Sequence, residues 1–301
     1  MSHIPVLLKE VVDKLRPKAG ETVLDATAGR GGHAKVLGEQ LGPSGHLILL
    51  DADQASLSKA HQNVSSLACR VTAIRGNFRR VNSLLDETGV KQVNVALFDL
   101  GFSSDQLTES GRGFSFLTEE PLLMTLADLP EEGLTAYEVV NEWCGDELER
   151  IFRDYGEERH AKVITQAIII ARREAPIATT RQLAELIRQV VPRGYANARL
   201  HPATRTFQAL RIAVNSELEA LAEGMTGIWA KLVPGGRLGV ISFHSLEAKI
   251  VKTYFKSLVA SDEGELLTKH ALKPEYAEVK QNPRARSAQL RVIAKKLILK
   301  L

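Results

Sequence analysis

The sequence has little cysteine and no long apolar run. Only two of its 301 residues are cysteines, Cys69 and Cys144, and they lie far apart. Because this spacing matches no metal or redox motif, we expect two buried free thiols of a cytoplasmic protein. No apolar run approaches the length of a membrane span, and residues 1–8 lack the basic and apolar regions of a signal peptide. The chain is therefore expected to be cytoplasmic, without a membrane partner.

Neither the histidines nor the net charge of the whole chain points to a particular ligand. The eight histidines include no H-x-x-x-H pair, so we expect no metal, and the formal net charge is only +3. Local charge is more informative: residues 188–211 contain five arginines, residues 280–300 contain seven Lys or Arg, and neither stretch has an acidic residue. Each stretch is typical either of a surface that faces phosphates or of an ordinary solvated face.

Strand and helix signals alternate from Glu21 to Asp99, which is typical of a parallel sheet with crossover helices. Helical spacing then dominates up to His201, and strand signals return near residues 237–243 and 288–294. We therefore predict an α/β domain of residues 1–106 and 205–301, with a helical insertion domain of residues 107–204. One long helix is expected over residues 206–232, and a loop over residues 261–282.

A glycine-rich turn follows the first predicted strand, at residues 25–33. Gly29 and Gly31, with Ala34, fit the pattern G-x-G-x-x-G/A, in which glycines let the backbone approach a ligand closely. The next strand ends at Asp51, 22 residues after Gly29. An acidic residue there can bind the two ribose hydroxyls of a nucleoside. The sequence therefore predicts a nucleoside-cofactor site, and an NAD(P)-dependent oxidoreductase is one interpretation.

Three predicted strands end in aspartate: Asp25, Asp51 and Asp99. Ligands of open α/β sheets bind at the carboxyl ends of strands, where these three side chains would gather. A carboxylate at Asp25 suits the ammonium group of a methionine moiety, which favours S-adenosylmethionine (SAM) over NAD. The competing interpretation, that each Asp only caps a following turn or helix, is weaker for three successive strand ends.

Several longer motifs occur together in this chain. They are HIPVLLKE (3–10), the glycine turn (25–33), DLGFSSDQL (99–107), RGFSF (112–116), YGEE (155–158), HPATRTFQALRIAVN (201–215), GGRLGVISFHSLE (235–247) and NPRARSAQLR (282–291). On these motifs the chain resembles the bacterial ribosomal RNA small-subunit methyltransferase H family, also called MraW. The resemblance implies SAM-dependent methylation of the N4 amino group of a cytidine in the decoding centre of 16S rRNA.

The resemblance also implies a class I, Rossmann-like methyltransferase fold with a helical insertion that faces RNA in the small ribosomal subunit. By the family's motifs, the SAM contacts would be Gly31, Gly32, His33, Asp51, Phe78, Asp99 and Gln106. The strand and glycine patterns described above add Asp25 and Gly29 to this set. Phe78 would lie against the adenine ring. Asp99 is the expected acceptor for the cytosine amine, helped by the hydroxyl groups of Ser103 and Ser104.

Candidate RNA contacts come from the basic stretches, from a polar stripe on the helix expected at residues 206–232, and from the loop after the strand expected at residues 237–243. They are Arg205, Gln208, Arg211, Asn215, His244, Arg284 and Arg286. The stripe, made of Gln208, Arg211 and Asn215, is either an ordinary solvent-exposed face or a functional one that holds RNA or braces the catalytic loop. His244 has two interpretations of equal weight, a contact to the base or ribose and a structural histidine.

The chain departs from the family pattern at Leu123, Thr125 and Ala248. The first two replace an acid and an arginine, and Ala248-Lys249 replaces Asp-Arg. These changes leave two alternatives to methylation of the usual target: a divergent paralogue acting on another RNA cytidine, and a non-catalytic RNA-binding protein. The sequence leaves open whether the chain forms a homodimer.

Overall fold

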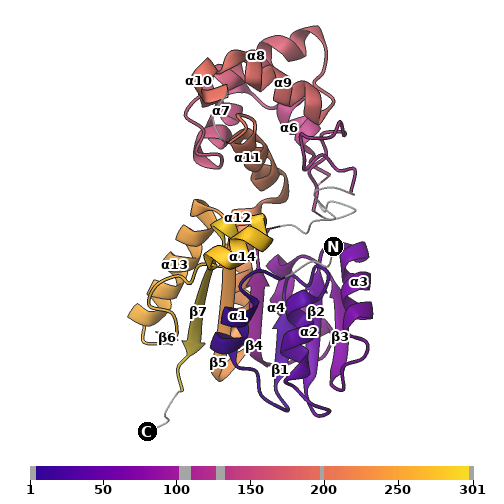
Figure 1. Cartoon of the computed structure of the whole chain (residues 1–301), viewed down its shortest axis with the longest axis vertical. Helices are drawn as coiled ribbons and strands as arrows, with labels where there is room; N and C mark the ends of the chain where they lie inside the picture. The colour runs from indigo at the N-terminus through magenta and orange to yellow at the C-terminus, as the bar shows by residue number, and fades with distance from the viewer. Residues whose placement is uncertain (1–4, 102–109, 127–132, 197–199, 298–301) are drawn as a thin grey trace. The chain divides into compact units, whose positions relative to one another are not determined.

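The structure is a computed structural model that describes residues 5–101, 110–126, 133–196 and 200–297. The chain forms two compact units, as Figure 1 shows. Unit 1 consists of Met1–Gly101 and Leu218–Leu301, and unit 2 consists of Phe102–Glu217. Among the described residues, no helix combines the length and the apolar character that a membrane span requires.

In the described residues, unit 1 is built on a seven-stranded sheet with the order β3-β2-β1-β4-β5-β7-β6. Five neighbouring strands run parallel, and β7 is antiparallel to both β5 and β6. This sheet confirms the predicted α/β class, a Rossmann-like fold of the class I methyltransferase type. The strands are β1 (Thr22–Asp25), β2 (His46–Asp51), β3 (Arg70–Arg75), β4 (Val93–Asp99), β5 (Leu232–Ser242), β6 (Gly264–Leu266) and β7 (Gln289–Lys295).

Helices cover both faces of this sheet. Successive strand residues point to opposite faces, so Val23 and Leu24 enter two separate apolar clusters. One cluster is completed by α1 (Leu8–Leu15), α2 (Gly32–Glu39) and α3 (Gln54–Val64), and the other by α4 (Val81–Glu87), α12 (Glu217–Lys231) and α13 (Ser245–Ala260). The remaining elements are the 3-10 turns η1 (Phe78–Arg80) and η2 (Pro283–Ser287) and the helix α14 (Tyr276–Gln281).

Unit 2 is helical and has its own apolar core. Its helices are α6 (Ala136–Glu142), α7 (Gly145–Asp154), α8 (Ala161–Glu174), α9 (Thr180–Val190), α10 (Arg193–Ala196) and α11 (Thr204–Asn215). Helix α9 begins with a capping box in which Thr179 accepts from the Gln182 N–H and Gln182 accepts from the Thr179 N–H.

Three expectations from the sequence are wrong. The helix expected at residues 206–232 is two helices, because Ser216 adopts a left-handed conformation (φ 46°) that ends α11. The loop expected at residues 261–282 contains β6 and α14, which are too short to show a periodic pattern. Cys144 is exposed rather than buried, because it stands at the N-cap of α7, whereas Cys69 is buried.

Candidate functional site

The three acidic strand ends lie on neighbouring parallel strands. Asp25, Asp51 and Asp99 are the last residues of β1, β2 and β4, and β1 pairs with both other strands. Parallel strands present their carboxyl ends at one edge of a sheet, so the three carboxylates belong to the same edge.

The turn after β1 continues between the two neighbouring strands. The Ala26 N–H donates to the Leu97 carbonyl of β4, and the Ala28 N–H donates to the Leu50 carbonyl of β2. The Thr27 hydroxyl accepts a 2.6 Å hydrogen bond from the Asp99 N–H. Thr27 was not singled out from the sequence, although a threonine in the first turn after an aspartate is a capping signal. These bonds fix the turn against both adjacent acidic strand ends.

Helix α2 begins directly after this turn. Its N-cap, Gly31, has φ 77°, and a Cβ atom there would lie 3.0 Å from the Cα of Ala60 in α3. Both the left-handed backbone and this close approach require glycine. The first N–H groups of a helix have no partner within the helix and attract anionic groups. The residues Gly31, Gly32 and His33 therefore present a suitable backbone for a carboxylate or a nucleoside.

Asp51 is held in place by backbone N–H groups. Its Oδ2 accepts from the Gly29 N–H at 2.8 Å, and its Oδ1 accepts from the Asp53 N–H at 2.9 Å. Burial nevertheless raises the pKa of Asp51 to about 6, and the charge of Asp53 adds to this rise. The carboxylate is therefore ionised at neutral pH and protonated at mildly acidic pH.

Asp25 is the most deeply buried of the three acids, with 2% of its surface exposed. Its Oδ1 accepts from the Thr27 N–H at 3.2 Å. Burial raises the pKa of Asp25 to about 6, although the nearby His33 opposes the shift. His33 is itself 5% exposed, and its Nδ1 lies 3.4 Å from Oδ2 of Asp99. One basic and two acidic side chains therefore lie close together beside the glycine turn, with Asp25 and His33 buried and Asp99 partly exposed.

Phe78 lies in η1, after β3. Its ring makes an edge-to-face contact with Phe98 of β4, with ring centroids 5.4 Å apart. The Asn77 side chain caps η1 by accepting from the Arg79 N–H. The ring is only partly buried, so part of it is accessible. This combination of packing and exposure suits a side chain that holds a flat ring of a ligand.

Other predicted site residues cannot be placed. Ser103, Ser104 and Gln106 lie outside the described residues, so their roles stay predictions from the sequence.

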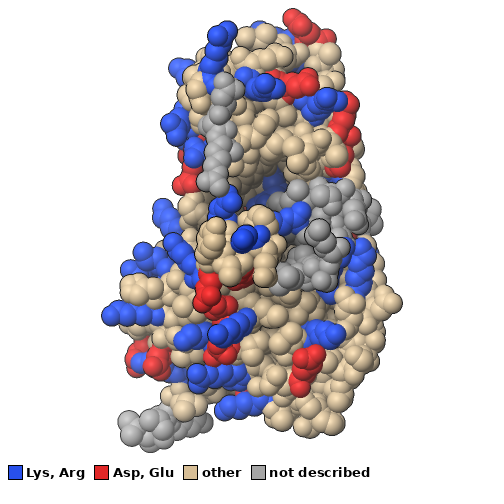
Figure 2. Space-filling view, viewed as in Figure 1, with Lys and Arg blue, Asp and Glu red and all other residues tan. Residues whose placement is uncertain are grey.

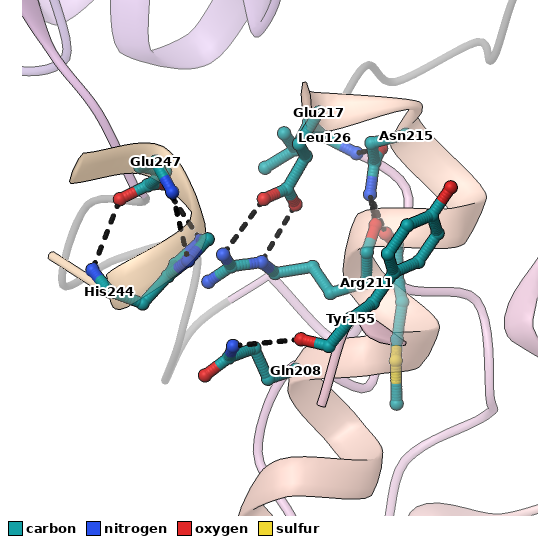
Figure 3. A network of polar contacts seen from close by, with 9 residues as sticks. Leu126, Tyr155, Gln208, Arg211, Asn215, Glu217, His244 and Glu247 are labelled. Atoms are coloured by element: carbon teal, nitrogen blue, oxygen red, sulfur yellow. Dashed lines mark hydrogen bonds and ion pairs between the residues drawn. The ribbon is translucent and has the colours of Figure 1, made fainter. Parts of the chain in front are cut away.

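In unit 2, the polar stripe of α11 contacts other parts of its own unit (Figure 3). Gln208 donates to the Tyr155 carbonyl at 3.1 Å, and Arg211 binds Glu217 through two hydrogen bonds of 2.7 and 2.8 Å. Asn215 accepts from the Leu126 N–H and donates to the Met124 carbonyl, at 2.8 and 2.7 Å. These contacts brace the segment that contains Met124 and Leu126. Bracing of the catalytic loop stays a prediction. The departures Leu123 and Thr125 flank Met124 in the segment that Asn215 holds.

His244 stands at the N-cap of α13 in unit 1. Its Nδ1 accepts from the Glu247 N–H at 3.4 Å, and its Nε2 lies 3.1 Å from a Glu247 carboxylate oxygen (Figure 3). Glu247 is 3% exposed and also accepts from the Phe243 N–H at 2.7 Å. The HSLE motif therefore forms a capping box, and His244 has a structural role in addition to any contact with a substrate.

The basic stretches are only partly available to a ligand. Arg284 and Arg286 are exposed in η2, whereas the ammonium group of Lys295 is bound by the carbonyls of Trp229 and Leu232. Arg205 donates to the Glu157 carbonyl at 3.0 Å. Figure 2 shows Lys and Arg side chains on the surface of both units, with acidic side chains between some of them. The face drawn in Figure 2 is therefore of mixed charge rather than uniformly basic.

Comparison with known proteins gives a match over nearly the whole chain. The model of the MraW methylase family matches residues 1–296. A ribosomal RNA small subunit methyltransferase H from Syntrophotalea carbinolica is 45% identical, covering 97% of this chain and 97% of the relative. The protein of the same name from Symbiobacterium thermophilum is 43% identical, covering 97% and 96%. A solved structure, a methyltransferase from Streptococcus mutans in complex with SAH, is 13% identical, with a TM-score of 0.46 over 97% and 99% of the two chains.

Proposed function

Because this chain belongs to the MraW methylase family, we propose that it uses SAM to methylate the N4 amino group of a cytidine in 16S rRNA. The observation that carries the proposal is the set of Asp25, Asp51 and Asp99 on three adjacent parallel strands beside a glycine turn. An oxidoreductase would need only the turn and Asp51. The family match over residues 1–296 disfavours an oxidoreductase. It also disfavours a divergent paralogue that acts on another RNA cytidine and a non-catalytic RNA-binding protein.

The described residues fit SAM. The Gly31–His33 backbone can bind its carboxylate, Asp25 its ammonium group, Asp51 its ribose hydroxyls and Phe78 its adenine ring. Gly29 contributes by holding Asp51 with its N–H. When bound, SAM supplies a methyl group that is already activated by a sulfonium centre. The protein therefore has to orient the acceptor nitrogen more than to activate the donor.

Asp99 is the residue that we assign to the acceptor nitrogen. The lone pair of the cytosine amine is delocalised into the ring, which makes the amine a weak nucleophile. A carboxylate that accepts a hydrogen bond from the amine makes this lone pair more available. Oδ1 of Asp99 is buried and has no hydrogen-bond partner among the described residues, so it can accept this bond. Ser103 and Ser104 remain predicted helpers from the same loop.

The target base has to be single-stranded or flipped out, because a paired cytosine does not expose its amino group to an enzyme. Exposed arginines such as Arg284 and Arg286 are suited to the phosphates around the target, and such contacts weaken as salt rises. We place the target in the decoding centre, the substrate in the small ribosomal subunit, the helical unit 2 on the RNA, and the reaction in the cytoplasm. Membership of the family supports these finer assignments.

Mass spectrometry of nuclease-digested 16S rRNA tests the function. Cells that lack the gene should lose one N4-methylated cytidine, and a plasmid copy of the wild-type gene should restore it. A copy with Asp99→Ala should fail to restore it. Asp86 is an exposed acidic residue of α4, so Asp86→Ala is the matched control. A plasmid copy with this substitution should restore methylation. Unchanged methylation in the deletion strain would refute the proposed function.

A further inference from the structure

The ring of His33 lies between two hydrogen-bond acceptors. Its Nε2 is 2.8 Å from the Val6 carbonyl oxygen, and its Nδ1 is 3.4 Å from Oδ2 of Asp99. A carbonyl oxygen only accepts hydrogen bonds, so Nε2 has to carry a hydrogen. An ionised carboxylate also only accepts, so the second contact is attractive only when Nδ1 carries a hydrogen too. When Asp99 is a carboxylate, only the imidazolium form of His33 satisfies both contacts.

The surrounding charges favour this form. Burial by itself lowers the pKa of His33, but the hydrogen bond and charge of Asp99, the charge of Asp25 and the Val6 carbonyl outweigh it and raise the pKa. Asp99 comes from β4, Asp25 from β1 and Val6 from the segment before α1. Among the described residues, both charged groups that act on the ring are acidic.

The acceptor on the far side of the ring is fixed as well. Leu7, next to Val6, donates from its N–H to the Glu278 carboxylate of α14 at 2.7 Å. Pro5 packs on Gly32, where a Cβ atom would lie 2.5 Å from the proline ring. The Val6 carbonyl therefore cannot move away without breaking contacts on both of its sides. The ring of His33 is held between a fixed carbonyl and the end of β4.

The two oxygens of Asp99 have different surroundings. Oδ2 faces His33, and the Asp99 N–H is bound by the Thr27 hydroxyl, so the end of the strand is anchored. Oδ1 is buried and lacks a partner among the described residues. A buried carboxylate oxygen without a donor is costly, and a ligand that donates a hydrogen bond would remove that cost.

We propose that His33 is a positioning residue for the methyl transfer: as an imidazolium it binds Oδ2 of Asp99 and leaves Oδ1 to accept from the substrate amine. The inference rests on the proposed function. In this arrangement Asp99 orients the amine and does not take its proton. The nitrogen gains the methyl group as the C–S bond of the donor breaks, and the methylated nitrogen then loses its extra proton to water. No bond of His33 is made or broken. This role of the side chain is separate from the expected contact between the His33 backbone and SAM.

Nuclear magnetic resonance of the full chain with ¹⁵N-labelled histidine tests the protonation state without RNA. At pH 7.5, where an ordinary histidine is about nine-tenths neutral, we expect His33 to carry hydrogens on both ring nitrogens. His33→Gln assigns the signal. His46 is the internal comparison, because burial and Arg70 lower its pKa, and it should be neutral. A single protonated nitrogen at His33 would overturn the proposal, and so would an imidazolium signal that persists unchanged in Asp99→Asn.

Kinetics test the positioning role. Glutamine at position 33 can donate to one of the two acceptors but carries no charge. We expect His33→Gln to lower kcat about tenfold or more, while the Kd for SAM changes by less than about threefold. His46→Gln, which loses a contact to Thr72 on β3, should keep the wild-type kcat. A wild-type kcat for His33→Gln refutes the inference. If the wild-type enzyme methylates no cytidine of 16S rRNA, the proposed function is refuted instead. The nuclear magnetic resonance result for His33 would then still stand.

Discussion

Arg211 and Glu217 form a two-point ion pair within unit 2, with 12% and 13% of their side chains exposed. The pair joins Arg211, one turn before the end of α11, to the residue after the break at Ser216. Removing one partner of a buried pair leaves the other charge without compensation. The pair therefore stabilises the direction in which the chain leaves α11.

We predict that Arg211→Met lowers the free energy of unfolding of unit 2 by about 3 kcal/mol. Each unit contains one tryptophan, Trp143 in unit 2 and Trp229 in unit 1. In a Trp229→Phe background, urea unfolding followed by fluorescence therefore reports on unit 2. The double variant Arg211→Met with Glu217→Leu should recover part of the loss, because no unpaired charge remains. A single variant as stable as its parent would contradict the prediction.

Asn215 should control the order of the segment that contains Met124 and Leu126. Asn215→Ala removes two hydrogen bonds to this segment and should cost about 1–3 kcal/mol. Hydrogen exchange read by mass spectrometry should become faster at Leu126, and no faster in the strands of unit 1. Gln208→Ala, which removes one bond to the Tyr155 carbonyl, is the matched control and should leave Leu126 unchanged. Slow exchange at Leu126 in Asn215→Ala would exclude the bracing role.

Asp51→Ala should weaken SAM binding by about 1–3 kcal/mol, because the ribose hydroxyls and the Gly29 N–H would lose their acceptor. Isothermal titration calorimetry measures the change directly, and Asp86→Ala on the surface of α4 is the control. An unchanged Kd would remove Asp51 from the ribose site.

The affinity for SAM should rise between pH 5 and pH 7. Asp25 and Asp51 each have a pKa of about 6, so only about a tenth of each is ionised at pH 5. Their ionised forms are the ones that bind an ammonium group and ribose hydroxyls, so protonation competes with binding. Titration of SAM at several pH values should show this loss. Equal affinity at pH 5 and pH 7 would show that neither carboxylate contacts SAM.

Ionisation of Asp25 should also lower the stability of the folded chain as the pH rises. Its pKa is about 6 in the folded chain against 3.8 for an ordinary aspartate, so the folded state holds the proton more tightly. Stability from this group is highest below pH 4 and falls as the pH rises towards 6. Asp25→Asn should therefore raise the Tm at pH 8 but not at pH 4, while weakening SAM binding. Asp86→Asn, at an exposed acid, should not raise the Tm at pH 8. A lower Tm for Asp25→Asn at pH 8 would contradict this account.

The sequence by itself determined the class of the fold and the acidic edge of the sheet. Strands with apolar residues on both faces and a glycine turn are local patterns, and parallel strands necessarily present their carboxyl ends together. For that reason Asp25, Asp51 and Asp99 could be grouped before the structure was known. The capping box at the start of α13 is harder to predict from HSLE, because histidine is not one of the usual N-cap residues.

Only the tertiary structure decided which partners the polar side chains have. Leu126 and Asn215 are 89 residues apart, and the Val6 carbonyl reaches His33 across 27 residues. Such pairs depend on how helices and strands pack, and no periodicity in the sequence records that packing. The left-handed residue Ser216, which splits the expected long helix, is likewise set by its surroundings, because serine has no intrinsic preference for that conformation.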